Sequence, residues 1–269
     1  MILDRVHLTN RLRSLCVSNV SHQSIPQKLM HRFRVEVIAK TPNPQQVIYA
    51  AMHQDYTDGF VFDERDSWPS ESQSGEVIVK RLLAGERGHY GPLEHPQIVF
   101  NCGYFPHSVM QQARTHRVGV SFDVQSFRYT GNQFIDVLEG KKDIEDVFYL
   151  RPVGYYTDRQ GKKYHYSPEQ RAADLEWCLE AAKRYKADFE AGMSEEHSRG
   201  KVPFDYRQHF VVSFNLRSFL HFCDLRNKKD AQLEIQKLCE MMWPHFEDWA
   251  PAIAQWYEKQ RLGKARLAP

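Results

Sequence analysis

Hydrophobic and polar positions first alternate regularly at residues 33–40, "FRVEVIAK". The first, third, fifth and seventh residues of this run are hydrophobic, and a period of two is typical of a half-buried strand. The run "QIVFNCGY" at residues 97–104 predicts a second strand. Extended runs at 133–138 ("QFIDVL") and 146–150 ("DVFYL") predict two more.

The clearest helical pattern spans residues 167–192. Ser167 is placed to cap the helix, Pro168 occupies its first position, and Gln170 can complete a capping box. Gly192 then ends the helix. Shorter helices are predicted over residues 43–52, 77–84, 106–117, 217–226 and 230–242, with Asn43 and Asp230 as the N-caps of the first and the last.

These patterns together predict a mixed α+β fold, in which a small sheet is flanked by long helices that dominate the second half. Residues 30–262 are expected to form a single domain, and the acidic, Ser-rich segment 55–75 a surface loop. Residues 1–29 have no secretory apolar region. We expect them to be a disordered or non-native extension upstream of Met30, with a weak organelle-targeting segment as the alternative. Residues 263–269 are expected to be a tail.

The overall charge is nearly balanced, because 36 Lys and Arg residues face 34 Asp and Glu residues, a net charge of +2. Nucleic-acid coats normally carry a larger positive excess, so no nucleic-acid partner is expected. No apolar run approaches the roughly 18 residues that span a bilayer, so no membrane partner is expected. The five cysteines form no CxxC pair and have apolar or aromatic neighbours. They predict buried free thiols in a reducing compartment, the cytoplasm.

Cations and hydroxyls are concentrated in one stretch, "ARTHRVGVSFDVQSFRYTG" at residues 113–131. Arginine presents a rigid fork of donors that matches a phosphate group, and it stays charged when desolvated. Arg128 lies between Phe127 and Tyr129, and burying an arginine among aromatics is costly unless an anion or a carboxylate meets it. The stretch therefore favours a phosphorylated ligand over a solvated cationic loop.

A second cationic cluster covers residues 198–226 and includes Asn215, Arg217 and His221. On a helix, Arg217 and His221 are four residues apart and share a face, and Asn215 can cap that helix. The alternative is that the arginines of this cluster only pair with acids such as Asp224 or Glu234.

A third cluster, "GHYGPLEH" at residues 88–95, contains His89, Glu94 and His95. Its spacing is not the HExxH of helical zinc sites, so a turn with one functional acid is expected rather than a metal site. No GxSxG elbow, P-loop or GxGxxG motif is present. A site rich in anion-binding groups and poor in nucleophiles suits a cofactor-driven reaction on a phosphorylated substrate.

All three clusters resemble the motifs of one family, the flavin-dependent thymidylate synthases. The run "THRVGVSFDVQSFRY" (115–129) resembles an Arg-His-Arg triplet followed by a spacer and Ser-x-Arg-Tyr. The run "NLRSFLHFCDLR" (215–226) resembles the family's later Asn-x-Arg-Ser block, and residues 88–95 resemble its His-x-x-Pro-x-Glu-His element. The three blocks occur in the family's order, which is far more specific than any single block.

The resemblance implies an enzyme that converts dUMP to dTMP, with methylenetetrahydrofolate as carbon donor, FAD as redox relay and NADPH as reductant. In this family no cysteine attacks the uracil, which agrees with the lack of a Pro-Cys pair in this sequence. The resemblance also implies a homotetramer with active sites shared between subunits.

Roles for individual residues follow from the resemblance. The flavin is expected to contact His116 and Arg117, with Glu94, Asn215, Arg217, His221 (in place of the family's usual Asn) and Leu225 completing its pocket. The substrate dUMP is expected at Gln112, Gln125, Ser126, Arg128, Arg199 and Arg226. Arg128 and Ser126 suit its phosphate. Arg226 suits the uracil carbonyls, where a fixed positive charge stabilises the developing negative charge. Arg226 and His89 are the expected catalytic residues, with His89 on the folate or nucleotide side of the flavin.

Besides His221, several positions depart from the family pattern, and the spacer between Arg117 and Ser121 is one residue longer than usual. Thr115 replaces the first Arg of the triplet, and Arg114 stands one place earlier. Val124 stands where the family has an acidic residue, so Gln125 or Asp123 is expected to cover that function. The changes at Thr115 and Val124 leave open a second possibility, a degenerate family member that binds flavin without making dTMP. A non-catalytic nucleotide- or RNA-binding module is the other alternative.

Overall fold

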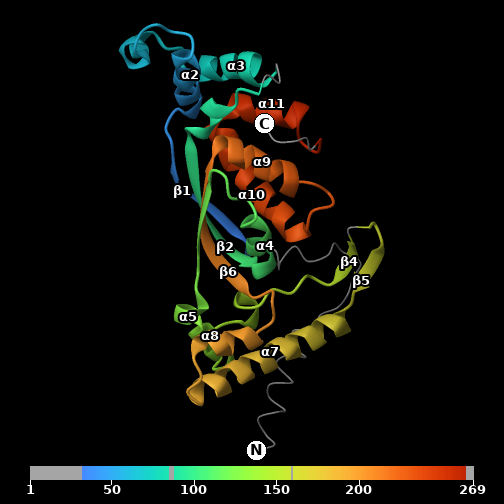
Figure 1. Cartoon of the computed structure of the whole chain (residues 1–269). Helices are drawn as coiled ribbons and strands as arrows, with labels where there is room; N and C mark the ends of the chain where they lie inside the picture. Colours follow the sequence, from blue (N-terminus) through green and yellow to red (C-terminus); the bar gives the residue numbers. More distant parts are fainter. Residues whose placement is uncertain (1–31, 85–87, 159, 265–269) are drawn as a thin grey trace, which may run out of the picture.

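A four-stranded antiparallel sheet forms the centre of the fold in the computed structural model, which describes residues 32–84, 88–158 and 160–264 (Figure 1). Its strands are β1 (Arg34–Lys40), β2 (Gln97–Pro106), β6 (Arg207–Asn215) and β3 (Val120–Val124), paired in that order. In the register of the sheet, Phe214 on β6 lies opposite Ile98 of β2 and Val120 of β3. This order brings the cationic segment 113–131 beside the end of β6.

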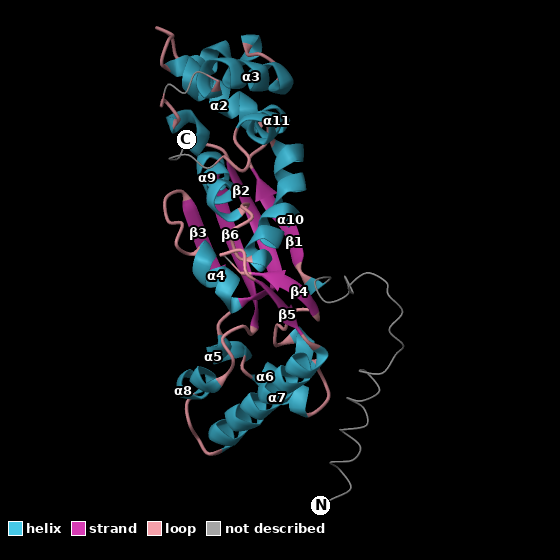
Figure 2. Cartoon of the chain, turned by 90° about the vertical axis from the view of Figure 1, so that its right-hand side faces the viewer, coloured by secondary structure: helices cyan, strands magenta, loops and turns pink. Residues whose placement is uncertain are grey.

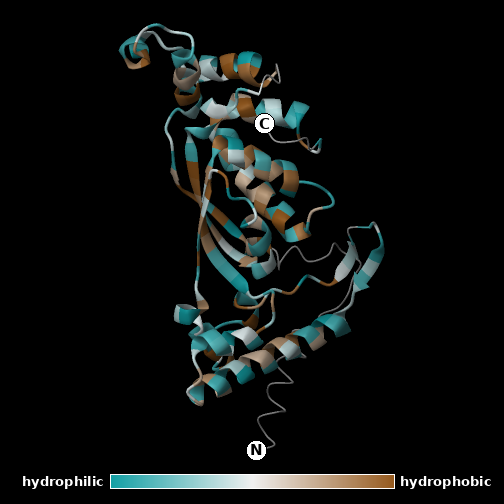
Figure 3. Ribbon diagram, viewed as in Figure 1, coloured by the Kyte–Doolittle hydropathy of each residue, from teal (hydrophilic) through white to brown (hydrophobic). Residues whose placement is uncertain are grey.

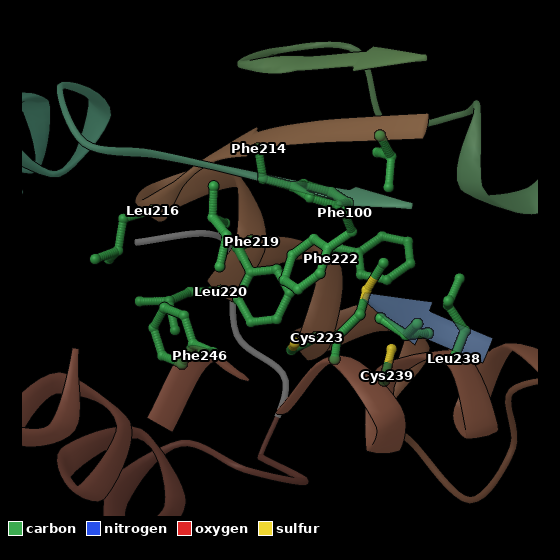
Figure 4. Packing of buried hydrophobic residues seen from close by; sticks show 14 of the residues in the cluster. Phe100, Phe214, Leu216, Phe219, Leu220, Phe222, Cys223, Leu238, Cys239 and Phe246 are labelled. Carbon is green, nitrogen blue, oxygen red and sulfur yellow. The ribbon is translucent and has the colours of Figure 1, made fainter. Parts of the chain in front are cut away.

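Three helices cover one face of this sheet (Figures 1 and 2). They are α4 (His107–Ala113), α9 (Leu216–Arg226) and α10 (Leu233–Trp249). Figure 3 shows hydrophobic residues gathered on α9 and α10. Phe219 of α9 stacks on Phe100 of β2 with ring centroids 5.9 Å apart, and on Phe246 of α10 at 4.8 Å (Figure 4). Aromatic packing therefore holds α9 against the centre of the sheet.

A helical layer packs at the end of the sheet where α9 begins (top of Figure 1). It contains α2 (Pro44–Gln54), the 3₁₀ helix η2 (Val61–Ser67), α3 (Glu71–Ile78), the π-helical turn η3 (Val79–Leu83), the 3₁₀ turn η4 (Gly91–Glu94) and α11 (Pro251–Gln260). Asn43 is the N-cap residue of α2 as predicted, but with a φ of 47° its side chain makes no capping hydrogen bond.

A second helical layer packs at the opposite end of the sheet. It contains α5 (Phe127–Thr130), α6 (Asn132–Leu138), the 3₁₀ turn η5 (Ile144–Asp146), the hairpin β4–β5 (Gly154–Thr157 and Lys163–Tyr166), α7 (Pro168–Glu190), α8 (Glu195–Ser198) and the 3₁₀ turn η6 (Arg199–Lys201). Phe127, Phe134, Phe148 and Tyr185 form a separate core there. The capping box predicted for Ser167 and Gln170 is present at the start of α7.

The predictions for β1, β2, α7 and α9 are confirmed, but the segment 133–138 is a helix and not a strand. Phe134 and Val137 lie three residues apart, so a helix turns both toward α7, where they are buried. Residues 146–150 form no strand either, and only a single bridge joins Phe148 to Tyr206. Short apolar runs fit a strand or one helical turn equally well, and here the long partner helix decides.

Several element boundaries also differ from the prediction. The segment 55–75 contains η2 and the start of α3, so it is not a loop throughout. The helix predicted over 106–117 ends at Ala113. The N-cap position of the last predicted helix is Gln232 rather than Asp230, and its side chain makes no capping hydrogen bond. The strands β3 and β6 were not predicted. Residues 1–29 and most of the predicted tail 263–269 lie outside the described residues.

The remaining expectations concern cysteines and membrane spans. Cys102, Cys178, Cys223 and Cys239 are buried free thiols, as predicted, while Cys16 lies outside the described residues. Of the helices within residues 32–264 that are described, none has the length and apolar character needed to cross a bilayer.

Replacing Asp224 by Ala should destabilise the protein by about 3–5 kcal/mol, because it leaves a buried cation without its partner. The Asp224 side chain is fully buried and accepts hydrogen bonds from Arg261 (2.6 Å) and from the Tyr257 hydroxyl (3.1 Å), which ties α11 to α9. Urea unfolding measures the change. The control is Glu180→Ala, which removes the exposed Glu180–Lys183 pair and should change stability by less than about 0.5 kcal/mol. Equal effects of the two substitutions would contradict this structural role.

Candidate active site

A pocket of about 550 Å³ lies where the segment after α4 meets the first turns of α9. It is lined by Thr115, His116, Arg117, Val118, Val120, Arg217, Ser218, His221 and Leu225. Five of the seven residues expected to contact a flavin line it, although they come from two segments about a hundred residues apart. The structure therefore brings most of this predicted set together.

Asn215 links the two segments that form the pocket. Its backbone N–H donates to Gly119 O (2.9 Å), and its side-chain Oδ1 caps α9 by accepting from Ser218 N–H (2.8 Å). Ser218 Oγ in turn donates to Val118 O (2.6 Å). Gly119 has a φ of +64°, and a β-carbon there would lie 2.1 Å from Asn215 Nδ2, so only glycine fits. Asn215 is 6 % exposed and shapes the pocket rather than lining it.

Arg217 reaches from α9 to the η4 turn, where its Nη1 lies 2.5 Å from Glu94 Oε1. Both side chains remain more than a third exposed. The alternative partners considered for the arginines, Asp224 and Glu234, bind Arg261 and Arg151 instead. Glu94 thus joins the site through its ion pair with Arg217.

Arg226, at the end of α9, has only neutral partners among the described residues. Its Nε donates to His116 Nε2 (3.0 Å), and its Nη2 donates to Thr115 Oγ1 (2.8 Å) and to Gln112 O (3.2 Å). Within the described part of the chain no carboxylate forms an ion pair with Arg226. Its positive charge is therefore fixed in place but not neutralised.

His116 is buried, with its ring 5.0 Å from that of Phe222 and 5.5 Å from that of His221. Burial, together with the nearby charges of Arg226 and His221, lowers the pKa of His116 to about 4. The imidazole is therefore neutral near pH 7, and its Nε2 can accept the hydrogen bond from Arg226.

The pocket fits a flavin, judged by an unpaired polar atom and by the groups around it. His221 Nδ1 is buried and makes no hydrogen bond with a described residue, which leaves it available to a ligand. The guanidinium groups of Arg117 and Arg217 suit phosphate, and Val118, Val120 and Leu225 offer apolar surface to a ring.

His89 lies apart from this set, in a second pocket of about 560 Å³. That pocket is lined by Tyr49, Met52, His53, Asp55, Tyr56, Val77, Lys80, Arg81, Leu82, His89 and Pro92. The η4 turn separates the two pockets, since Pro92 lines this one and Glu94 pairs with Arg217 at the other.

Three residues expected to bind dUMP lie near the opposite end of the sheet. Ser126 caps α5, Arg128 belongs to α5, and Arg199 follows α8, which packs against α5. Arg128 forms an ion pair with Glu196 (2.8 Å) and is half exposed, and its neighbour Tyr129 is 82 % exposed. The expectation that aromatics bury Arg128 is therefore wrong in the single chain, because only Phe127 turns inward.

Two further residues expected near dUMP, Gln112 and Gln125, already form hydrogen bonds within the protein. Gln112 Nε2 donates to Gln232 Oε1, and Gln232 Nε2 donates to the buried carboxylate of Glu234 (2.7 Å). Gln125 Oε1 accepts from the backbone N–H of His209 (3.4 Å), so that side chain turns toward β6.

The structure adds residues that the sequence did not single out. Val118, Val120 and Ser218 line the pocket, Gln232 holds Gln112, and Glu196 pairs with Arg128. Thr115 was noted only as a departure from the Arg-His-Arg triplet, yet it contacts Arg226. The unusual residue within the motif was the one available signal for Thr115.

Comparison with known proteins identifies the same family that the sequence motifs resemble. The family described as "Thymidylate synthase complementing protein" matches residues 36–252. The chain belongs to this family. It is 32 % identical over 250 residues to the flavin-dependent thymidylate synthase of Haloarcula marismortui, covering 87 % of this chain and 99 % of that protein. It is 30 % identical over 249 residues to the flavin-dependent thymidylate synthase of Halobacterium salinarum, covering 88 % of this chain and all of that protein.

Two solved structures of other proteins have a similar fold. One is the UMP/dUMP methylase PolB of Streptomyces cacaoi bound with 5-Br dUMP (TM-score 0.67, 18 % identity, 88 % of this chain and 97 % of that one). The other is thymidylate synthase X of Helicobacter pylori with FAD and dUMP (TM-score 0.59, 18 % identity, 78 % and 92 %). The predicted family, the α+β fold and the enzyme class, a flavin-dependent synthase making dTMP from dUMP, are confirmed.

This protein should lose stability between pH 6.5 and pH 4, in part because His116 becomes protonated more readily in the unfolded chain. The native pKa of about 4 lies below the usual 6.5, so the unfolded chain binds this proton more readily across that interval. The free energy of unfolding should therefore fall as the pH falls, with a His116 contribution of roughly 1–2 kcal/mol after solvent screening. Urea unfolding at pH 6.5, 5 and 4 should show a smaller drop for His116→Gln, which keeps a neutral acceptor. Parallel curves for the two proteins would contradict the depressed pKa.

Proposed function

We propose that this protein uses methylenetetrahydrofolate as carbon donor, FAD as redox cofactor and NADPH as reductant when it forms dTMP from dUMP. One observation carries the proposal. The pocket gathers His116, Arg117, Arg217, His221 and Leu225 next to Arg226, whose charge no carboxylate among the described residues neutralises. This combination suits an anionic cofactor beside a substrate that develops negative charge.

FAD, when bound and reduced by NADPH, would supply the hydride that converts the transferred carbon into a methyl group. We assign its binding to His116, Arg117, Arg217, His221 and Leu225, with Glu94 and Asn215 behind them. Glu94 orients Arg217 through their ion pair, and Asn215 fixes the start of α9. The free Nδ1 of His221 offers the cofactor one hydrogen bond inside the pocket.

Arg226 is the proposed catalytic cation. Its guanidinium would donate to the uracil carbonyls and stabilise the negative charge that develops on the ring during carbon transfer. Because the partners of Arg226 are neutral, no internal ion pair neutralises its charge, which can therefore act on the substrate.

A protein nucleophile is not needed for this reaction, and the described cysteines are poorly suited to the role. Burial raises the pKa of Cys178 to about 12 and raises the pKa values of Cys102 and Cys223 as well. Thiols with raised pKa values are weak nucleophiles at neutral pH. Buried reduced thiols also support our proposal of a cytoplasmic location.

The second pocket is the proposed folate side of the site. It combines the aromatic rings of Tyr49 and Tyr56 with the cations Lys80 and Arg81, and it also contains His89. Rings and cations together suit an aromatic ligand that carries carboxylates. We assign His89 to this side, and we treat residues 30–262 as the catalytic unit.

We further propose a homotetramer whose subunits share each active site. Within the segment 113–131, Arg117 is the last residue assigned to the flavin and Ser126 is the first assigned to the phosphate. The extended strand β3 lies between them. At about 3.4 Å per residue these two groups lie on the order of 20–30 Å apart along the edge of the sheet. One dUMP cannot bridge that span, so the phosphate-binding residues Ser126, Arg128 and Arg199, with Gln125, would complete a site on a neighbouring subunit. Gln112 stays beside Arg226, which donates to its backbone carbonyl.

The purified protein should be yellow or become so with added FAD, and NADPH should bleach its flavin bands under anaerobic conditions. Expression in a thymidine-requiring bacterial strain should restore growth without thymidine. A protein that binds FAD without supporting growth would be a degenerate family member. One that binds no FAD, yet binds RNA with a steep salt dependence, would be a nucleic-acid module instead.

Arg128→Ala should raise the KM for dUMP about tenfold or more and leave the FAD content unchanged, since it removes a charged phosphate contact. Steady-state kinetics and the flavin-to-protein absorbance ratio measure the two effects. The matched control is Glu196→Gln, which frees Arg128 from its ion pair and should leave the KM equal or lower. Parallel loss of dUMP affinity and FAD in Arg128→Ala would contradict the phosphate assignment.

A further inference from the structure

Thr115 occupies a position with direct access to both the pocket and Arg226. It follows the C-terminal end of α4, its side chain is exposed, and it lines the same pocket as His116 and Arg117. Its Oγ1 donates a hydrogen bond to Gln112 O (2.8 Å), three residues earlier. Because the hydroxyl proton is used in that bond, the lone pairs of Oγ1 are left to accept from another group.

That other group is Arg226. Its Nη2 donates to Thr115 Oγ1 (2.8 Å) and to Gln112 O (3.2 Å), and its Nε donates to His116 Nε2 (3.0 Å). These three acceptors lie along one side of the planar guanidinium, so they fix its rotation as well as its position. Nη1 is left without a hydrogen bond to any described residue.

Three other partly buried arginines are held in a different way from Arg226. Arg151, Arg217 and Arg261 each meet a carboxylate, from Glu234, Glu94 and Asp224 respectively. A carboxylate would orient a guanidinium equally well, but it would also cancel the charge that the substrate needs. A hydroxyl orients the group and leaves the charge uncompensated.

We propose that Thr115 is a positioning residue for Arg226, which holds the guanidinium plane through its hydroxyl so that Nη1 faces the uracil of dUMP. This inference rests on the proposed function, in which Arg226 contacts that ring. It also gives a role to the residue that replaces the first Arg of the triplet: a second guanidinium would repel Arg226, whereas a threonine accepts from it. The exposed Arg114 makes no such contact with Arg226 among the described residues.

The test compares Thr115→Val, which keeps the shape and removes the hydroxyl, with Thr115→Ser, which keeps the hydroxyl. The full-length holoenzyme is assayed for kcat and KM with dUMP, FAD content and melting temperature. Thr115→Val should lower kcat/KM for dUMP about tenfold, with FAD content and melting temperature unchanged. Thr115→Ser should retain at least half of the wild-type value. Ser67→Ala is the control, because Ser67 Oγ makes the same kind of bond to Glu64 O (2.7 Å) at an exposed position away from the pocket.

The two proposals fail in different ways. Absence of dTMP formation by the wild-type holoenzyme would overturn the proposed function. With an active wild type, equal kcat/KM for Thr115→Val and wild type would overturn the role of Thr115. So would a Thr115→Ser variant as impaired as Thr115→Val, or a Thr115→Val variant that loses FAD in proportion to activity. Titration with dUMP, followed by the change in flavin absorbance, provides a binding measurement that does not depend on turnover.

Discussion

The contact between Gly119 and Asn215 is the constraint on which the candidate active site depends. Asn215 ends β6 and caps α9, and the same residue binds the backbone of Gly119 just before β3 begins. A side chain at position 119 would collide with Asn215 and Ser218. This close approach brings His116 and Arg117 against Arg217 and His221, and thereby forms the pocket from two distant segments.

The electrostatics of the site depend on the partners of its two arginines, Arg217 and Arg226. Arg217 is directed outward to Glu94, so one charge is balanced at the rim of the pocket. Arg226, at the other end of α9, donates hydrogen bonds to an imidazole, a hydroxyl and a backbone carbonyl. The same burial that lowers the pKa of His116 keeps this imidazole neutral and able to accept. A neutral histidine and an uncompensated arginine therefore depend on one another.

The sheet also separates the parts of the site. The edge strand β3 leads from the segment that holds His116 and Arg117 to α5, which packs against α8 (Figure 2). Arg128 of α5 and Glu196 of α8 form an exposed ion pair there. An exposed ion pair contributes little stability, so a ligand phosphate can replace the carboxylate at small cost. This separation is the basis of our proposal that another subunit completes the site, since β3 lies between the pocket and Arg128 within one chain.

The sequence by itself determined the family, the α+β class, the helices α7 and α9 with their capping residues, and the residues of three motifs, because these depend on local spacing and side-chain chemistry. It did not determine that 133–138 is a helix or that 207–215 is one of the two inner strands, since short apolar runs take their conformation from the partner they pack against. Only the tertiary structure decided which predicted residues meet. Five of the residues predicted to bind the flavin share one pocket, whereas His89 and Arg128 lie elsewhere. Pairings such as Arg217 with Glu94, or Arg226 with Thr115, depend on how sheet and helices cross, and no local pattern in the chain records that.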